Sequence, residues 1–394
     1  MPKLCKAEDC TGCSACANIC PNHCISMLPD PEGFLRPVID ELSCVDCELC
    51  QQVCPLLNAS PLLPDGETIA FAAINKDEQI RYDSTSGGVF SLLCQQVLGQ
   101  GGVVFGAAYD ESFNVTHTLV DTQEGLSKLR GAKYAQSDLG HTFCRVREIL
   151  EQDKYVLFSG TPCQVGGLVS FLGKDYEKLI LVDLICHGVP SPQVWQKYIA
   201  YRSTADACGT QPEGINLRSK ETGWPGYSIR FAYPNAVYSA KNVDDPYLRG
   251  FVGNLFLRPS CYQCHFKGSR RQSDFTLGDY WGIWDQQPDY HDGKGTSLVL
   301  LHSPKAMAYW RRISSSIRFT SVDVQESLSG NSSAIESSLC PAAREAFLAR
   351  YDNEDFSSLI DELLPKHTPV PSPLARAKSV LRKVKARIVP HGKI

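Results

Sequence analysis

The chain of 394 residues lacks several features that would place it in a common class. No apolar run reaches the roughly 18 residues that a membrane-spanning helix needs, so we expect no transmembrane segment. The net charge is only −4 at pH 7, which gives no strong field to attract nucleic acid. The first residues, MPKLCKAEDC, contain no apolar signal segment. We therefore expect a cytoplasmic protein without a nucleic-acid partner.

Two common nucleotide-binding signatures are also missing. No GxGxxG follows a predicted strand, since residues 99–102 do not have that spacing, and no GxxxxGK[ST] loop occurs. These absences exclude the usual dinucleotide and P-loop sites. The composition is otherwise that of a globular protein, with 43% hydrophobic and 21% charged residues. A chain of this length is expected to form two or more domains.

The residue in excess is cysteine, which occurs 18 times. The spacing CxxCxxCxxxCP appears twice, at residues 10–21 and at residues 44–55. It is typical of bacterial two-cluster ferredoxins, in which the fourth cysteine of each motif ligates the other cluster. The predicted ligands of the first [4Fe–4S] cluster are Cys10, Cys13, Cys16 and Cys54, and those of the second are Cys20, Cys44, Cys47 and Cys50.

Other interpretations of these cysteines are weaker. A secreted disulfide scaffold is disfavoured because thiolate clusters suit a reducing cytoplasm. Zinc or disulfide cysteines would not explain two complete motif copies, each followed by proline. Cys24 lies close enough to the first motif for a ligand role to stay open.

From about residue 69 the pattern changes to alternating strands and helices. Strands are predicted at residues 69–74, 103–109, 155–158 and 179–186, and helices at 84–98, 139–150, 160–172 and 191–201. This alternation favours an α/β domain with a largely parallel sheet.

The predicted fold thus combines the α+β and α/β classes. Residues 1–60 form a small two-cluster ferredoxin domain. The larger α/β domain has an N-terminal part at 69–155 and a C-terminal part at 156–345. Residues 61–66 are a stiff linker.

Residues 365–394 are predicted to be a proline-rich linker followed by a basic amphipathic tail. Such a tail can contact an anionic membrane surface or an acidic partner. A solvated tail without a partner is the alternative.

Four further cysteines stand where a site is expected. Cys163 and Cys186 follow two predicted strands, and sites gather at the carboxyl ends of strands in open α/β sheets. Cys261 and Cys264 form a CxxC pair. The four thiols suit a third [4Fe–4S] cluster. A zinc site, a redox disulfide between Cys261 and Cys264, and haem attachment at CxxCH are the alternatives.

Six motifs follow one another in the second part of the chain. They are STSGGVF at 84–90, LRGAKY at 129–134, GTPCQ at 160–164, ICHGVPSP at 185–192, RPSCYQC at 258–264 and SDFTLGDYWG at 273–282. In this order, over residues 69–300, the chain resembles the coenzyme F-420 hydrogenase/dehydrogenase beta-subunit family. The resemblance implies bound FAD, a [4Fe–4S] cluster on the internal cysteines, and electron exchange with a deazaflavin or another organic acceptor.

The flavin-binding residues are predicted from this resemblance and from local chemistry. Ser86, Gly87 and Gly88 begin a helix, whose free N–H groups and dipole favour a pyrophosphate; a plain helix cap is the alternative. Lys133 can stabilise the reduced flavin near N1, and Tyr134 can stack on its ring. An exposed lysine and a core tyrosine are the alternative.

Four more residues complete the predicted site. Thr161 and Gln164 flank Cys163 and are expected to donate hydrogen bonds to cluster sulfur or flavin. His187 is a predicted proton relay, with a structural histidine as the alternative. Asp279 is assigned to acid–base chemistry or to capping a turn.

The predicted function is that of an FAD- and [4Fe–4S]-dependent oxidoreductase. It relays electrons between a ferredoxin or another redox protein and a two-electron organic substrate, coenzyme F-420 or another metabolite. The alternative is an electron-transfer subunit or accessory protein with no substrate of its own. Such a subunit would serve a hydrogenase, a dehydrogenase or a polysaccharide-biosynthesis pathway.

Overall fold

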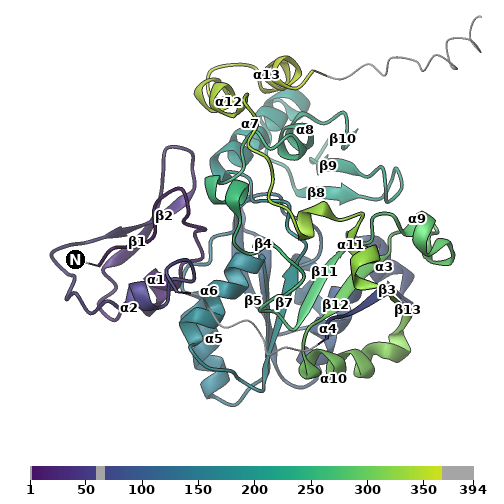
Figure 1. Cartoon of the computed structure of the whole chain (residues 1–394). Coiled ribbons are helices and arrows are strands. Elements are labelled where there is room, and N and C mark those ends of the chain that lie inside the picture. Colours follow the sequence, from purple (N-terminus) through teal and green to yellow (C-terminus); the bar gives the residue numbers. More distant parts are fainter. Residues whose placement is uncertain (1, 59–66, 366–394) are drawn as a thin grey trace, which may run out of the picture.

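The computed structural model of the protein describes residues 2–58 and 67–365 (Figure 1). The predicted linker at 61–66 and residues 366–394 of the predicted basic tail lie outside this range.

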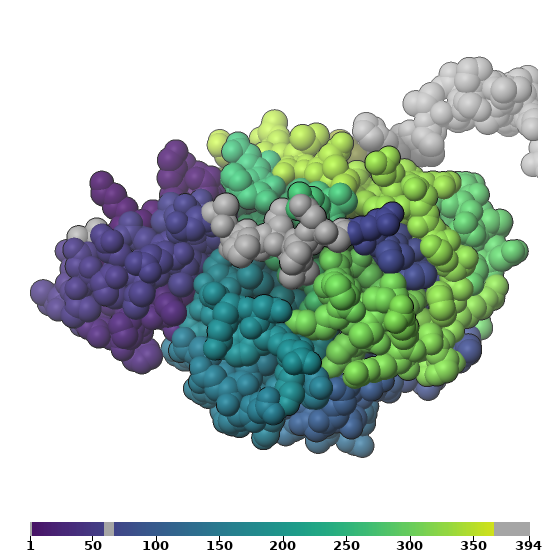
Figure 2. Space-filling model, turned by 60° about the horizontal axis from the view of Figure 1, so that its bottom comes forward, coloured from purple at the N-terminus to yellow at the C-terminus, as the bar shows by residue number. Residues whose placement is uncertain are grey.

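A small unit of two short helices and one hairpin forms the N-terminal end. Its elements are α1 (Ala15–Ile19), β1 (Ile25–Pro29), β2 (Leu35–Ile39) and α2 (Leu49–Gln52), with β1 and β2 paired antiparallel. The hairpin turn is held by Asp30, whose carboxylate accepts the N–H groups of Glu32 and Phe34 at 3.0 and 2.9 Å. Figure 2 shows this unit, in purple, as a lobe at one side of the larger body.

The larger body is built on an eight-stranded sheet. In spatial order its strands are β13 (Ile317–Val322), β3 (Ile69–Asn75), β12 (Ser297–Leu301), β11 (Phe275–Asp279), β7 (Leu179–Leu184), β6 (Val156–Gly160), β4 (Val103–Tyr109) and β5 (Val115–Val120). The prediction of a largely parallel sheet was wrong, because only three of its seven pairings are parallel. The strands β5, β12 and β13 run against the others, and β5 returns from β4 through residues 110–114, a length that suits antiparallel neighbours.

Helices cover both faces of this sheet. They are α3 (Glu78–Asp83), α4 (Val89–Leu98), α5 (Thr142–Glu151), α6 (Pro162–Leu172) and α10 (Pro304–Ile313). Successive side chains of β6 point to opposite faces of the sheet, so this strand contributes to a hydrophobic core on each face. Leu157 packs in the core that contains α4 and α10, whereas Val156 and Phe158 pack in the core that contains α5 and α6.

The strands β7 and β11 are neighbours in the sheet, and the segment of the sequence that connects them forms a second layer. It contains α7 (Pro192–Ala207), a three-stranded antiparallel sheet of β8 (Gly214–Ser219), β9 (Ser228–Ala232) and β10 (Val237–Lys241), and α8 (Pro246–Val252). Helices α12 (Arg344–Arg350) and α13 (Phe356–Leu363) pack against it, while α9 (Ile283–Gln286) and α11 (Val324–Leu328) lie nearer the large sheet (Figure 1). Aromatic side chains dominate this core, including Trp195, Tyr198 and Tyr247.

The α5/α6 core gives a first prediction. Phe158 has no exposed surface, and its ring centroid lies 5.8 Å from that of Phe143. Phe158→Ala is expected to lower the free energy of unfolding by about 3–5 kcal/mol through lost burial and a cavity. Val237 is 56% exposed, so Val237→Ala should change it by no more than about 0.5 kcal/mol. Urea unfolding followed by circular dichroism compares the two variants, and equal losses would contradict this core assignment.

Candidate functional site

The first predicted ligand set gathers around one hollow in the N-terminal unit. Cys10, Cys13, Cys16 and Cys54 all line it. Cys54 comes from the second motif, as the crossing rule for paired ferredoxin clusters requires. Cys5 lines the same hollow. Hydrogen bonds to Cys10 and Cys54 raise the pKa of Cys5, which therefore keeps its proton beside them.

The second predicted set surrounds a separate hollow. Cys44, Cys47 and Cys50 line it together with Cys20 of the first motif. Cys24 also lines this hollow, and its Sγ lies 3.2 Å from that of Cys20. Each hollow thus contains a fifth thiol. The sequence pointed to Cys24 by proximity, but nothing in the spacing distinguished Cys5.

The four internal cysteines are brought together at one end of the large sheet. Cys163 is in the first turn of α6, Cys186 follows β7, and the other two lie in and just after the short helix Pro259–Gln263. Burial raises the pKa of Cys163, and the nearby charges of Cys186, Cys264 and Cys261 raise it further. The four thiols are therefore close enough to repel one another when ionised.

The protein already holds two of these thiols in place. The Thr161 hydroxyl oxygen lies 3.1 Å from Cys163 Sγ, and the Val189 N–H donates to Cys261 Sγ at 3.4 Å. The N-terminus of α6 also presents the positive end of its dipole to Cys163. A set of four thiols is the donor chemistry that iron–sulfur clusters and zinc prefer.

Within residues 2–58 and 67–365, no group of three or more His, Cys, Asp or Glu side chains surrounds a point that could hold a single metal ion. A four-iron cube differs in that each thiolate binds its own iron at a separate corner.

The N-terminal unit docks on the helix that carries Cys163. Gly167 lies one turn further along α6, and a Cβ built on it would come 2.7 Å from Cys13 Cβ and 2.9 Å from Cys13 Sγ. Asn18 in α1 donates to the Gly140 carbonyl at 2.8 Å, and the Cys144 thiol donates to the Asn18 carbonyl at 3.2 Å. The first ligand set therefore lies against α6, one helical turn from an internal cysteine.

The predicted phosphate-binding run is tightly packed. Ser86 Oγ donates to the Thr296 carbonyl at 2.7 Å, and the Gly87 N–H donates to Ser297 Oγ at 2.9 Å. A Cβ on Gly87 would lie 2.2 Å from the Ala73 carbonyl oxygen, so close packing explains this glycine. Gly88 adopts φ +83° as the residue before α4. The Gly87 N–H is thus not a free donor, and a phosphate role rests on the first turn of α4.

Lys133 and Tyr134 lie beside the end of β4. Lys133 Nζ donates to the carbonyls of Lys128 and Arg130 at 2.9 and 2.7 Å. Burial lowers the pKa of Lys133 to about 7, although these acceptors favour its charged form. The Tyr134 ring stacks on Phe251 at 4.6 Å between centroids.

Thr161, Gln164 and His187 also have partners within the protein. The Thr161 N–H donates to Gln164 Oε1 at 2.9 Å, and Gln164 Nε2 donates to Ser137 Oγ at 2.9 Å. His187 Nε2 lies 2.6 Å from Asn254 Oδ1, and its Nδ1 lies 3.3 Å from Ser333 Oγ. Burial lowers the pKa of His187, and its two partners hold the ring in place.

Asp279 ends β11 and joins a cluster of cations and aromatic rings. Its carboxylate accepts from Trp224 Nε1 at 2.9 Å and forms an ion pair with Arg218 at 2.9 Å. The Arg218 guanidinium lies 3.8 Å from the Tyr227 ring centroid, and the Trp224 and Trp281 rings stack at 4.9 Å. No sequence signal pointed to Trp224, because it lies 55 positions from Asp279.

Buried Lys220 lies between the Asp279–Arg218 ion pair and the segment Ser86–Gly88. Its Nζ donates to the carbonyls of Arg81 and Ser86, both at 2.7 Å. Burial lowers the pKa of Lys220 to about 7.

Comparison with known families finds two matching segments, and the predicted cluster cysteines lie within them. Residues 9–57 match the model of the 4Fe-4S dicluster domain. This segment of the chain contains all eight motif cysteines. Residues 153–327 match the family model for the C-terminal part of the coenzyme F420 hydrogenase/dehydrogenase beta subunit, and they contain the other four. The resemblance inferred from the motifs is confirmed for these segments, and the beta-subunit segment thus follows an iron–sulfur dicluster domain in one chain.

Two individual proteins are similar to parts of this chain. One is an uncharacterized polyferredoxin-like protein of Methanocaldococcus jannaschii, 34% identical over an alignment of 76 residues that covers 16% of this chain. The alignment spans 45% of that relative, or about half its length. The other is a chain of the F420-reducing [NiFe] hydrogenase complex from Methanosarcina barkeri, with a TM-score of 0.45 and 16% identity over 81% of this chain and 93% of that one. Structural similarity at this level supports no further argument.

No helix in the described part of the chain is both long and apolar enough to span a membrane.

The close approach of α6 and Cys13 gives a second prediction. Gly167→Ala is expected to destabilise the protein by about 1–3 kcal/mol, because the new methyl group overlaps Cys13. Gly214→Ala is the control, since a Cβ there meets no atom within 4 Å. Thermal unfolding of the iron-loaded protein measures the effect. A Gly167→Ala variant as stable as Gly214→Ala would contradict the docking of the N-terminal unit on α6.

Proposed function

We propose that the protein is an FAD- and [4Fe–4S]-dependent oxidoreductase. It relays electrons between a one-electron carrier protein and a two-electron organic substrate, coenzyme F-420 or another metabolite. The observation that carries this proposal is the gathering of four cysteines at the carboxyl end of the sheet, in a segment of the beta-subunit family. The first ferredoxin ligand set lies one turn of α6 away.

The internal cysteines would hold a third [4Fe–4S] cluster. When bound, such a cluster changes its charge by one electron at a time. Cys163, Cys186, Cys261 and Cys264 supply the thiolates, while Thr161 and the Val189 N–H are placed to donate to sulfur. Hydrogen bonds to sulfur are one of the factors that set the potential of such a cluster.

The carboxyl end of the sheet also has the chemistry that a flavin needs. A flavin accepts one or two electrons and so connects clusters to an organic substrate. Arg218, Lys220 and Lys133 supply positive charge there, and Tyr134 and Trp281 supply aromatic surface. Because Ser86 and Gly87 are already bonded to β12 and its preceding residue, the pyrophosphate would meet the first turn of α4.

We assign proton handling in this site to Lys133 and His187, and the positioning of Arg218 to Asp279. Lys133, with a pKa of about 7, can hold or release a proton near neutral pH. His187 is fixed by Asn254 and Ser333, and the Ser333 hydroxyl is the partner that could exchange a proton with the ring. Asp279 keeps Arg218 in place and acts through that cation.

The carrier protein would meet the chain at the second ligand set. Cys47 is exposed, and Leu42 and Val45 beside it are 99% and 63% exposed. Exposed apolar side chains next to a ligand allow close approach of another redox protein. A ferredoxin in the cytoplasm is the carrier that fits this role.

Iron analysis tests the internal site. Anaerobically purified protein is expected to contain about 12 irons per chain, as three four-iron clusters. The double variant Cys163→Ala, Cys261→Ala should lose about four of them and keep the ferredoxin-type signals in electron paramagnetic resonance. Cys340→Ala removes an exposed cysteine outside the sets and should lose none. Equal iron in all three proteins would contradict the third cluster.

Flavin analysis separates this function from the alternative. One FAD per chain, with an absorbance that bleaches on addition of reduced F-420, is the expected result. A protein with full iron and no flavin would instead be an electron-transfer subunit without a substrate of its own.

A further inference from the structure

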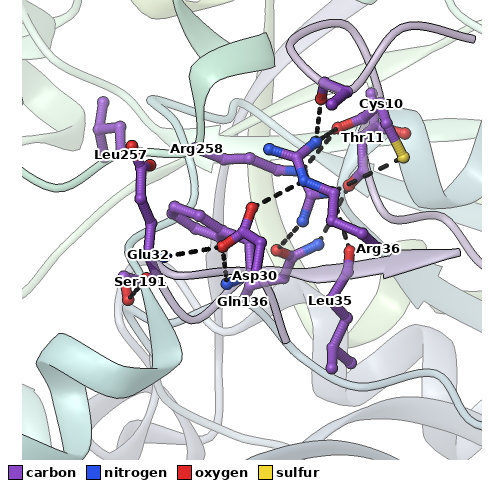
Figure 3. Close-up of polar contacts among 12 residues, drawn as sticks. Cys10, Thr11, Asp30, Glu32, Leu35, Arg36, Gln136, Ser191, Leu257 and Arg258 are labelled. Carbon is purple, nitrogen blue, oxygen red and sulfur yellow. Dashed lines mark hydrogen bonds and ion pairs between the residues drawn. The ribbon is translucent and has the colours of Figure 1, made fainter. Parts of the chain in front are cut away.

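Arg258 extends from the beta-subunit segment into the N-terminal unit (Figure 3). It stands three residues before Cys261 and has no exposed surface. Its Nε donates to the Cys10 carbonyl at 2.7 Å, and its Nη2 donates to the Leu35 carbonyl at 2.9 Å and lies 3.7 Å from Cys10 Sγ. Its Nη1 donates to Gln136 Oε1 at 2.6 Å. Arg258 therefore belongs to the loop of Cys261, and its side chain binds the loop of Cys10.

The charge of Arg258 has no carboxylate partner among residues 2–58 and 67–365. A buried cation is costly unless an anion compensates it. The anions within reach are thiolates. Cys10 Sγ, 3.7 Å from Nη2, is the sulfur that Arg258 contacts directly. Cys261 and Cys163 also act on Arg258 through their charges.

The surroundings fix this guanidinium closely. Gly12 has φ +69°, and a Cβ on it would lie 2.7 Å from Arg258 Nη1 and 2.6 Å from Gln136 Nε2. Gln136 Nε2 donates to the Thr11 carbonyl at 3.0 Å. The loop of Cys10 is thus closed over Arg258 and Gln136.

A second arginine crosses the same boundary in a different way. Arg344 forms an ion pair with Glu32 in the hairpin turn and donates to the Leu257 carbonyl at 3.1 Å. Its charge is compensated by a carboxylate, and no thiol of the described residues is among its hydrogen-bond partners. Arg344 therefore serves as the matched control for Arg258.

We infer that Arg258 is a positioning residue that couples the first ferredoxin cluster site to the internal cysteine site. It holds the Cys10 loop against the Cys261 loop, and it places one positive charge between the two sets of thiolates. The part of this inference that concerns the Cys10 site rests on the dicluster domain alone. The part that concerns the Cys261 site rests on the proposed function.

The expected consequence is a change of redox potential. Four thiolates outweigh the positive charge of a four-iron cube, so the unit is an anion that becomes more negative on reduction. A fixed cation beside it favours the reduced form, and net charge and hydrogen bonds to sulfur are recognised determinants of the potential. Removing the cation should therefore make reduction harder.

A redox titration of the anaerobic holoprotein, followed by electron paramagnetic resonance, tests this inference. Arg258→Gln is expected to shift the midpoint potential of one ferredoxin-type signal to a more negative value and leave the other unchanged. Arg344→Gln should shift neither. Arg258→Lys, which keeps the charge but not the branched donor geometry, should give a smaller negative shift than glutamine. Iron content is measured on each sample.

Unchanged midpoints in an iron-replete Arg258→Gln protein would overturn the inference, as would equal shifts in the Arg344→Gln protein. If the glutamine variant loses iron, an iron-replete Arg258→Met protein decides, and an unchanged midpoint there contradicts the role of Arg258. The same titration on the Cys163→Ala, Cys261→Ala background separates the two parts of the inference. A shift that persists there supports the contact with Cys10 even if the proposed third cluster fails.

Discussion

Crowded, buried thiols are the constraint on which this structure depends. Burial raises the pKa of Cys16 and of Cys163, and neighbouring thiolates raise both further. Such groups are costly to ionise unless a metal takes their charge, and metal binding requires the thiolate. The fold supplies local compensation through the dipole of α6 at Cys163 and the guanidinium of Arg258 near Cys10. The clusters are therefore expected to stabilise the parts of the protein that gather them.

The sheet topology explains how distant cysteines meet. Parallel strands β6 and β7 end at the same edge, which places Cys163 and Cys186 side by side. The inserted layer between β7 and β11 then returns the chain to that edge with Cys261 and Cys264. Antiparallel strands β12 and β13 extend the sheet on the far side of β11 without adding a cysteine. The internal thiols thus gather at the carboxyl ends of the central strands, and the N-terminal unit docks next to them.

Local spacing predicted which cysteines of the two motifs line each hollow of the N-terminal unit, because ferredoxin motifs encode their geometry within a few residues. Contacts between distant segments could not be predicted in this way. Gly87 looked like part of a phosphate loop, but its lack of a side chain serves packing against Ala73. Asp279 gave no sign of its partner Trp224, and the direction of β12 depended on a connection that residue periodicity does not specify. Arg258 was visible as a charge before a CxxC, but only the structure shows that it binds Cys10.

We propose that the three groups of thiols form one continuous redox unit. Anomalous scattering at the iron edge, from crystals grown without oxygen, tests it most directly. Three compact iron peaks are expected, and the peak at Cys10, Cys13, Cys16 and Cys54 should lie between the other two. Two peaks confined to the N-terminal unit, or zinc in place of iron among Cys163, Cys186, Cys261 and Cys264, would contradict it.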